Sequence, residues 1–235
     1  MEKRIVNIKP WILAARPKTL WASVSPVLIG TALAIDQNAF HFPSALIAMI
    51  GAVLIQIGTN YANDYFDYLK GVDSTERLGP TRATAAGWVR PVHMRNAFLL
   101  VFIMTAVLGS YLIFRAGWPI VLIGALALFF AITYTAGPFP LGYNGLGDIF
   151  VFVFFGPVAV GGTYYVQTLT INSTVLLAGS APGLFSMAIL TVNNLRDLDQ
   201  DRNAGKKTLQ VRLGRRFGQQ QYLWSILLAC FTPLL

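Results

Sequence analysis

Residues 43–67 read PSALIAMIGAVLIQIGTNYANDYFD, an apolar run that ends in a cluster of Asn and Asp side chains. About 20 helical residues span a hydrocarbon core of about 30 Å, so the run is long enough to cross a membrane. Pro43 stands at its start, where a missing backbone N–H costs a helix nothing. The stretch therefore predicts a membrane-spanning helix whose last turns carry carboxylates.

Similar apolar runs recur along the whole chain. Of its 235 residues, 55% are hydrophobic and only 12% are charged, whereas a soluble domain carries about 25% charged residues. We expect helices near residues 20–36, 43–63, 95–114, 118–135, 147–166, 174–195 and 217–235. The composition predicts an all-α polytopic membrane protein with about seven transmembrane helices. A soluble helical enzyme would need polar helix faces that these runs lack.

We expect residues 1–235 to form a single membrane-embedded domain. The last apolar run stops at Pro233-Leu234-Leu235 without a polar flank. A spanning helix normally has interfacial anchors on both sides. We therefore expect the domain to be incomplete at its C-terminus.

All but one of the 18 Lys and Arg residues fall in three segments: the N-terminus, the link after the second apolar run and the region after the sixth. Cytoplasmic loops carry such an excess, so we place all three segments in the cytoplasm and the protein in the plasma membrane. The net charge of +8 follows from this orientation, with attraction to anionic lipid as a further cause. It does not indicate a nucleic-acid partner.

Two of these basic segments begin with acidic and amide side chains at helical spacing. Each group shares one helical face: Asn60, Asp64 and Asp67 in the first, and Asn193, Asp197 and Asp201 in the second. A charge inside a membrane costs about 2.5–3.5 kcal/mol at the helix centre and is functional by default. Solvated helix ends paired with nearby Arg would explain one such group, but explain two on the same side less well.

Mg²⁺ is the compensating cation that this pattern favours, because it takes one or two carboxylates together with substrate phosphates. We predict that Asp64, Asp67, Asp197 and Asp201 are catalytic and bind Mg²⁺. Nearby polar side chains are expected to bind an anionic substrate: Arg16, Asn60, Asn63, Lys70, Arg82, Tyr134, Asn193 and Asn194. The long link between the second and third runs is expected to fold as a cap over this site.

Six stretches of the chain carry a family resemblance. They are RPKT (16–19), NYANDYFDYLKGVD (60–73), GPTR (79–82), YTAGP (134–138), GLGD (145–148) and NNLRDLDQDR (193–202). Together, and in this order, they resemble the UbiA superfamily of intramembrane aromatic prenyltransferases. The branch that prenylates 1,4-dihydroxy-2-naphthoate in menaquinone synthesis is the most similar.

The resemblance implies a helical bundle, typically of nine spans, around a cavity that cytoplasmic loops cap and that opens sideways to membrane lipid. It implies that the Asp side chains with Asn60 hold Mg²⁺ on a polyprenyl diphosphate, while Arg16, Lys70 and Arg82 neutralise the diphosphate. The prenyl group would pass to the naphthoate with decarboxylation, giving demethylmenaquinone. Pro138 stands where many relatives carry Lys, which argues against 4-hydroxybenzoate as the aromatic acceptor.

Two alternatives remain open from the sequence. The first keeps the diphosphate site but takes another aromatic acceptor, such as homogentisate or 4-hydroxybenzoate. The second is an ion-coupled membrane transporter, whose site would lie near the bilayer midplane rather than at one end. The prenyl chain length and the oligomeric state do not follow from the sequence.

Overall fold

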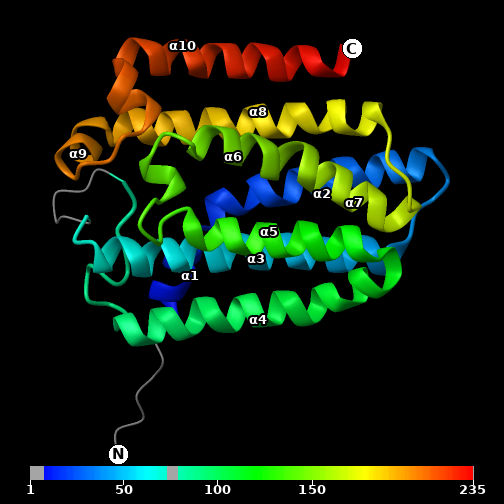
Figure 1. Ribbon diagram of the computed structural model, residues 1–235, viewed down its shortest axis with the longest axis horizontal. Helices are drawn as coiled ribbons and strands as arrows, with labels where there is room; N and C mark the ends of the chain where they lie inside the picture. The colour runs from blue at the N-terminus through cyan, green and yellow to red at the C-terminus, as the bar shows by residue number, and fades with distance from the viewer. Residues whose placement is uncertain (1–7, 73–78, 235) are drawn as a thin grey trace, which may run out of the picture.

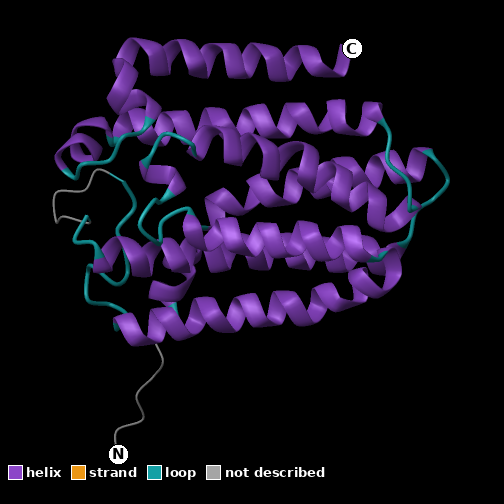
Figure 2. Cartoon of the chain, in the orientation of Figure 1, coloured by secondary structure: helices purple, strands orange, loops and turns teal. Residues whose placement is uncertain are grey.

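The computed structural model describes residues 8–72 and 79–234 of the chain. These residues form helices, turns and loops, with no strand among them (Figure 2). The predicted all-α class is therefore confirmed.

Long helices occupy all seven of the predicted apolar stretches. The helices are α1 (Lys9–Ala15), α2 (Pro17–Asp36), α3 (Phe42–Leu69), α4 (Pro91–Ala116), α5 (Trp118–Thr133), α6 (Gly147–Val153), η2 (Phe154–Val158), α7 (Ala159–Thr168), α8 (Ser173–Arg196), α9 (Leu198–Asn203) and α10 (Leu209–Phe231). Two short 3₁₀ turns, η1 (Leu141–Tyr143) and η3 (Thr232–Leu234), complete them. Helix α3 continues to Leu69, so Asp64 and Asp67 belong to the helix itself.

Five helical stretches in the described residues are long and apolar enough to cross a membrane: α2, α3, α4, the continuous stretch Gly147–Thr168, and α8. Helix α5 is apolar but has only 16 residues. Helix α10 carries Arg212, Arg215 and Arg216 in its first half, which lowers its hydropathy. The chain therefore crosses the membrane several times. Among the described residues, five of the seven expected spans have the full length and hydropathy, and α5 and α10 do not.

The long helices run side by side, and the described parts of the segments predicted to be cytoplasmic meet at one end of the bundle (Figure 1). That end, at the left of the view, holds the last turns of α3, helix α9 and the loops after α3 and α5. Within the bundle, α3 packs against α4, α2 against α7, and α8 against α10. The fold therefore brings both Asn/Asp groups to the same end.

Small residues let α6, η2 and α8 approach closely. A Cβ atom on Gly183 would lie 2.6 Å from the carbonyl oxygen of Phe152, and one on Gly156 would lie 2.6 Å from that of Gly179. Glycine at these positions lets two backbones touch, which is how helices associate in lipid. This contact fixes one wall of the bundle.

We predict that Gly183→Ala destabilises the protein by about 1–3 kcal/mol, because the added methyl group meets backbone that cannot move aside. Thermal unfolding in detergent measures the loss. The matched control is Gly109→Ala, where a Cβ atom has no neighbour within 4 Å. It should leave the midpoint unchanged or raise it. Equal midpoints for the two variants would contradict the close packing.

Candidate active site

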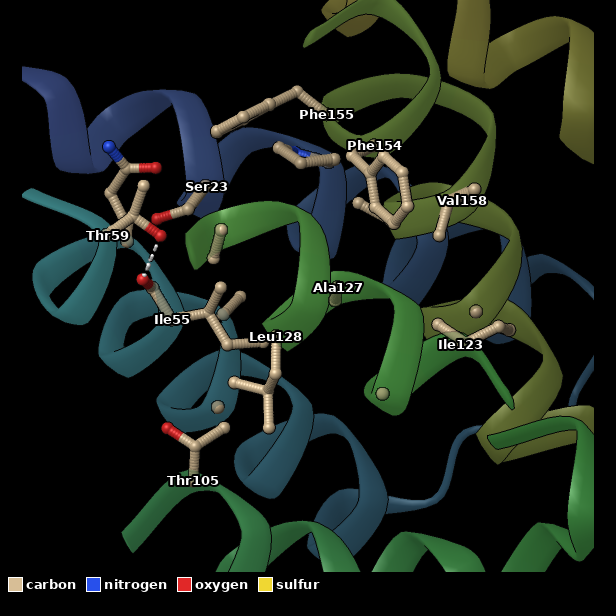
Figure 3. A pocket seen from close by; sticks show the side chains of 18 of the residues that line it. Ser23, Ile55, Thr59, Thr105, Ile123, Ala127, Leu128, Phe154, Phe155 and Val158 are labelled. Carbon is tan, nitrogen blue, oxygen red and sulfur yellow. Dashed lines mark hydrogen bonds between the residues drawn. The ribbon is translucent and has the colours of Figure 1, made fainter. Parts of the chain in front are cut away.

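A cavity of about 620 Å³ lies between the helices (Figure 3). Apolar side chains line most of it, including Ile55, Leu128 and Phe154 in the close view. Its polar end is lined by Arg16, Asn60, Asn63, Tyr134 and Asn193. The far end is lined by Leu112, Ile113, Ile120 and Val166. The cavity thus suits a long apolar molecule with a polar head.

Asn60 fixes the chain beside the polar end. Its Nδ2 donates to the carbonyl oxygen of Ala15 at 2.9 Å and to the hydroxyl of Thr19 at 3.2 Å. Between these two residues, Arg16 has a left-handed backbone (φ 53°) and separates α1 from α2. Asn60 therefore holds the junction that places Arg16 at the cavity.

Asp67 is a buried carboxylate with two strong partners. Nη2 of Arg82 lies 2.5 Å from its Oδ2, and the hydroxyl of Tyr143 donates to its Oδ1 at 2.5 Å. Arg82 is also buried, so the ion pair is shielded from water. Such charge-assisted contacts are stronger than neutral hydrogen bonds. They tie α3 to the loop after it and to the loop after α5.

Tyr143 joins the two acidic groups through its ring. The ammonium groups of Lys70 and Lys206 lie 4.6 and 4.8 Å from the ring centroid. Lys206 also pairs with Asp201 at 3.1 Å, and Lys70 donates to the carbonyl oxygen of Thr135 at 2.6 Å. Burial lowers the pKa of Lys70; Asp67 opposes this shift and Lys206 adds to it.

The second acidic group lies where α8 ends. Asp197 has a non-helical backbone (φ −93°, ψ 11°), so the expected continuous face from Asn193 through Asp197 to Asp201 is broken. Both carboxylate oxygens of Asp197 accept from Arg196 at 2.7 Å. The N–H of Asp201 still donates to the carbonyl of Asp197 at 2.8 Å, which keeps the two residues close.

Asn194 was expected to bind substrate, but it is not among the residues that line the cavity. Its side chain faces α10 instead. It begins a chain of amide hydrogen bonds: Asn194 donates to Gln210 at 3.0 Å, Gln210 to Gln221 at 2.9 Å, and Gln221 to Asp148 at 2.7 Å. Polar contacts of this kind hold helices together in lipid. We therefore assign Asn194 to packing between α8 and α10.

Tyr134 does line the cavity, and two glycines make room for it. A Cβ atom on Gly142 would lie 2.7 Å from its ring, and one on Gly147 would lie 2.9 Å from its hydroxyl. The next residue, Thr135, donates a hydrogen bond to the amide oxygen of Asn63. The loop after α5 is thereby attached to α3 at the polar end.

Residues 23–235 match the family model described as the UbiA prenyltransferase family. The chain belongs to this family. It is 39% identical to 1,4-dihydroxy-2-naphthoate octaprenyltransferase of Haemophilus influenzae, over 97% of this chain and 78% of the relative. It is 41% identical to the enzyme of the same name from Escherichia coli, over 91% of this chain and 71% of the relative.

Solved structures show the same fold. A UbiA homolog from Archaeoglobus fulgidus bound to DMAPP and Mg²⁺ superposes with a TM-score of 0.69 at 12% identity. The superposition covers 94% of this chain and 75% of that chain. At 12% identity, this structural similarity is evidence for the fold alone. It confirms the predicted UbiA-like helical bundle.

Of the predicted site residues, Arg16, Asn60, Asn63, Tyr134 and Asn193 line the cavity, whereas Asp64, Asp67, Lys70, Arg82, Asp197 and Asp201 are not among its lining residues. The sequence prediction did not include Tyr143, which contacts Asp67, Lys70 and Lys206. Aromatic residues near the helix ends were noticeable, yet nothing in the spacing links position 143 to position 67. Across residues 8–72 and 79–234, no three His, Cys, Asp or Glu side chains form a ready metal cluster. Instead, Asp67, Asp197 and Asp201 contact cations, and Asp64 accepts two backbone N–H groups.

We predict that Tyr143→Leu raises the KM for polyprenyl diphosphate more than Tyr143→Phe does. The Phe variant loses only the hydroxyl on Asp67, a contact to a charged group that contributes about 1.5–3 kcal/mol. The Leu variant also loses the ring face that holds Lys70 and Lys206. Prenyl transfer in membranes measures both, with Tyr222→Phe on the exposed face of α10 as the control. An unchanged KM in the Leu variant would contradict the central role of Tyr143.

Proposed function

We propose that this prenyltransferase moves a polyprenyl group from polyprenyl diphosphate to 1,4-dihydroxy-2-naphthoate with loss of the carboxylate, giving demethylmenaquinone. The names of the relatives in Haemophilus influenzae and Escherichia coli support the acceptor. Pro138 agrees with it, since the family resemblance implies a Lys at this position in many relatives and so argues against 4-hydroxybenzoate. The observation that carries the proposal is the apolar cavity, whose polar end is lined by Asn60 and Asn63, within two turns of α3 from the ion pair of Asp67 with Arg82.

In this proposal the prenyl tail occupies the apolar cavity, and the diphosphate lies at the polar end near Arg16, Lys70 and Arg82. The guanidinium group of Arg suits phosphate oxygens, because its planar geometry allows it to donate two parallel hydrogen bonds. The cavity walls keep water from the reacting carbon, as a reactive allylic cation requires.

The donor chemistry at the polar end fits Mg²⁺. Three carboxylates each lie beside a cation: Asp67 beside Arg82, Asp197 beside Arg196 and Asp201 beside Lys206. Hard carboxylate oxygens are ligands that Mg²⁺ accepts. We propose that these three acids hold the metal while the released cations bind diphosphate oxygens. Bound Mg²⁺ would neutralise charge on the leaving diphosphate.

Aromatic rings are placed to flank the allylic carbon. Phe130, Phe150 and Phe154 all line the cavity, with ring centroids 4.5 Å apart for the first two and 5.5 Å for Phe130 and Phe154. An aromatic face stabilises a nearby cation by about 0.5–2 kcal/mol. Phe130 lies one turn before Tyr134 at the end of α5. We propose that these rings receive the prenyl carbon and the aromatic acceptor.

The proposal includes an orientation. We place the protein in the plasma membrane, surrounded by lipid, with the N-terminus and the site loops cytoplasmic. The gathering of the basic segments at one end of the bundle supports this placement.

The proposed activity is tested in membranes with Mg²⁺, a polyprenyl diphosphate and, separately, 1,4-dihydroxy-2-naphthoate, 4-hydroxybenzoate and homogentisate. We expect product from the naphthoate alone. Asp67→Asn and Asp197→Asn should lower kcat/KM at least about 100-fold, since each loses a proposed ligand of the metal. The matched control is Asp199→Asn, because Asp199 is exposed and pairs only weakly, with Arg202 at 3.5 Å.

Product from another acceptor would contradict the naphthoate assignment but leave the prenyltransferase site in place. No product from any acceptor, with folded protein, would contradict the proposed function as a whole. Equal losses in the Asp199 and Asp67 variants would contradict the assignment of the metal ligands.

A further inference from the structure

Helix α10 bends sharply near its start, at Gly214. The backbone there has φ 87° and ψ 171°, a positive φ that glycine adopts without strain. The bend separates a short arm, residues 208–213, from the long second part of the helix, and the two parts run in different directions (Figure 1). Thr208 caps the arm, because its hydroxyl accepts the N–H of Val211 at 3.3 Å.

Two amide side chains hold the bend closed. Nε2 of Gln210, on the arm, donates to Oε1 of Gln221, beyond the bend, at 2.9 Å. In a straight helix these two residues would lie about 16 Å apart along the axis, so the hydrogen bond forms only in the bent helix. Gln210 is fully buried, and Gly218 makes room for it, since a Cβ atom on Gly218 would lie 2.9 Å from Cγ of Gln210.

The direction of these hydrogen bonds is set by Asp148 on α6. A carboxylate only accepts, so Gln221 turns its Nε2 to Asp148 at 2.7 Å, and its Oε1 accepts from Gln210. The Oε1 of Gln210 in turn accepts from Asn194 of α8 at 3.0 Å. Gln210 is therefore held from two sides, and losing either partner would leave a buried amide group unsatisfied, which is costly.

The other side of the arm rests on the loop after α5. The N–H of Lys207, just before the arm, donates to the carbonyl oxygen of Tyr143 at 2.7 Å. Nη2 of Arg212, on the arm, donates to the carbonyl oxygen of Asn144 at 3.1 Å. The arm thus connects the amide chain between the helices to the loop that carries Tyr143.

Lys206 directly precedes this attached segment. Its ammonium group lies 3.1 Å from Asp201 and 4.8 Å from the ring centroid of Tyr143. We infer that Gln210 is a positioning residue that acts through Lys206: it holds the bent arm in place and thereby keeps the ammonium group at Asp201 and Tyr143. The inference rests on the proposed function, in which Lys206 is one of the cations that bind diphosphate oxygens.

Two variants release the arm without removing a charge from the site. Gln210→Leu loses both hydrogen bonds of the arm to the helices, and Gln221→Leu, at a half-buried position, loses the one across the bend. We expect each to raise the KM for polyprenyl diphosphate about fivefold, the change that one lost hydrogen bond of ordinary strength gives. In a Lys206→Met background this rise should disappear, because the effects of residues that act through one another are not additive.

Gly183→Ala is the matched control for a general loss of stability, since its strain lies in the contact of α8 with α6 and η2. Any effect of Gly183→Ala on KM should be the same with and without Lys206→Met.

Hydrogen exchange gives a readout that does not depend on activity. We expect the backbone N–H groups of residues 206–213 to exchange about tenfold faster in Gln210→Leu and in Gln221→Leu, because the arm opens locally. Those of α4 should exchange as in the unsubstituted protein. Mass spectrometry of peptides from the protein in detergent measures both regions. No substrate is present, so failure of this measurement is distinguishable from failure of the proposed function.

Unchanged exchange of residues 206–213 in both variants would overturn the inference. Faster exchange, together with an equal rise in KM with and without Lys206→Met, would show that Gln210 does not act through Lys206 and would overturn it as well. An unchanged KM in Lys206→Met alone would remove Lys206 from the diphosphate site, and the positioning role of Gln210 with it.

Discussion

The structure depends on one constraint, the burial of two carboxylates in the last turns of α3. Asp64 and Asp67 lie where an apolar helix reaches the end of the bundle, and neither is more than 3% exposed. A buried carboxylate must be paired or hydrogen-bonded. Asp64 takes two backbone N–H groups, and Asp67 takes Arg82 and Tyr143. Meeting this requirement attaches the loop after α3 and the loop after α5 to the end of α3, and brings Arg82 to Asp67.

The same contacts explain how a ligand would change the site. Asp67, Asp197 and Asp201 are each paired with a cation, so their charges are compensated before substrate arrives. A magnesium diphosphate complex offers both partners at once, positive to the acids and negative to the cations. If the acids and cations exchange partners with this complex, no buried charge is left unpaired. Leaving one unpaired would cost about 3–5 kcal/mol.

The sequence predicted the helices well because their signal is local: each apolar run is long enough to span lipid. The apolar run ends near residue 63, but the helical spacing of Asn60, Asp64 and Asp67 predicted that the helix goes on through them, and α3 does continue to Leu69. The contacts that bury Asp64 and Asp67 come from loops, which hydropathy does not report. Spacing likewise grouped Asn193, Asp197 and Asp201 on one face, but the break at Asp197 depends on backbone conformation. Tyr143 lies 76 residues from Asp67, and no periodic pattern reports such a contact.

A structure of the protein with Mg²⁺ and a polyprenyl thiolodiphosphate, an analogue that resists ionisation, is the most direct test of the diphosphate site. We expect the tail in the cavity toward Ile120, metal density beside Asp67 and Asp201, and Arg82 moved from Asp67 onto a phosphate oxygen. An analogue bound elsewhere, with the Arg82–Asp67 pair unchanged, would contradict the assignment of this end of the bundle as the diphosphate site.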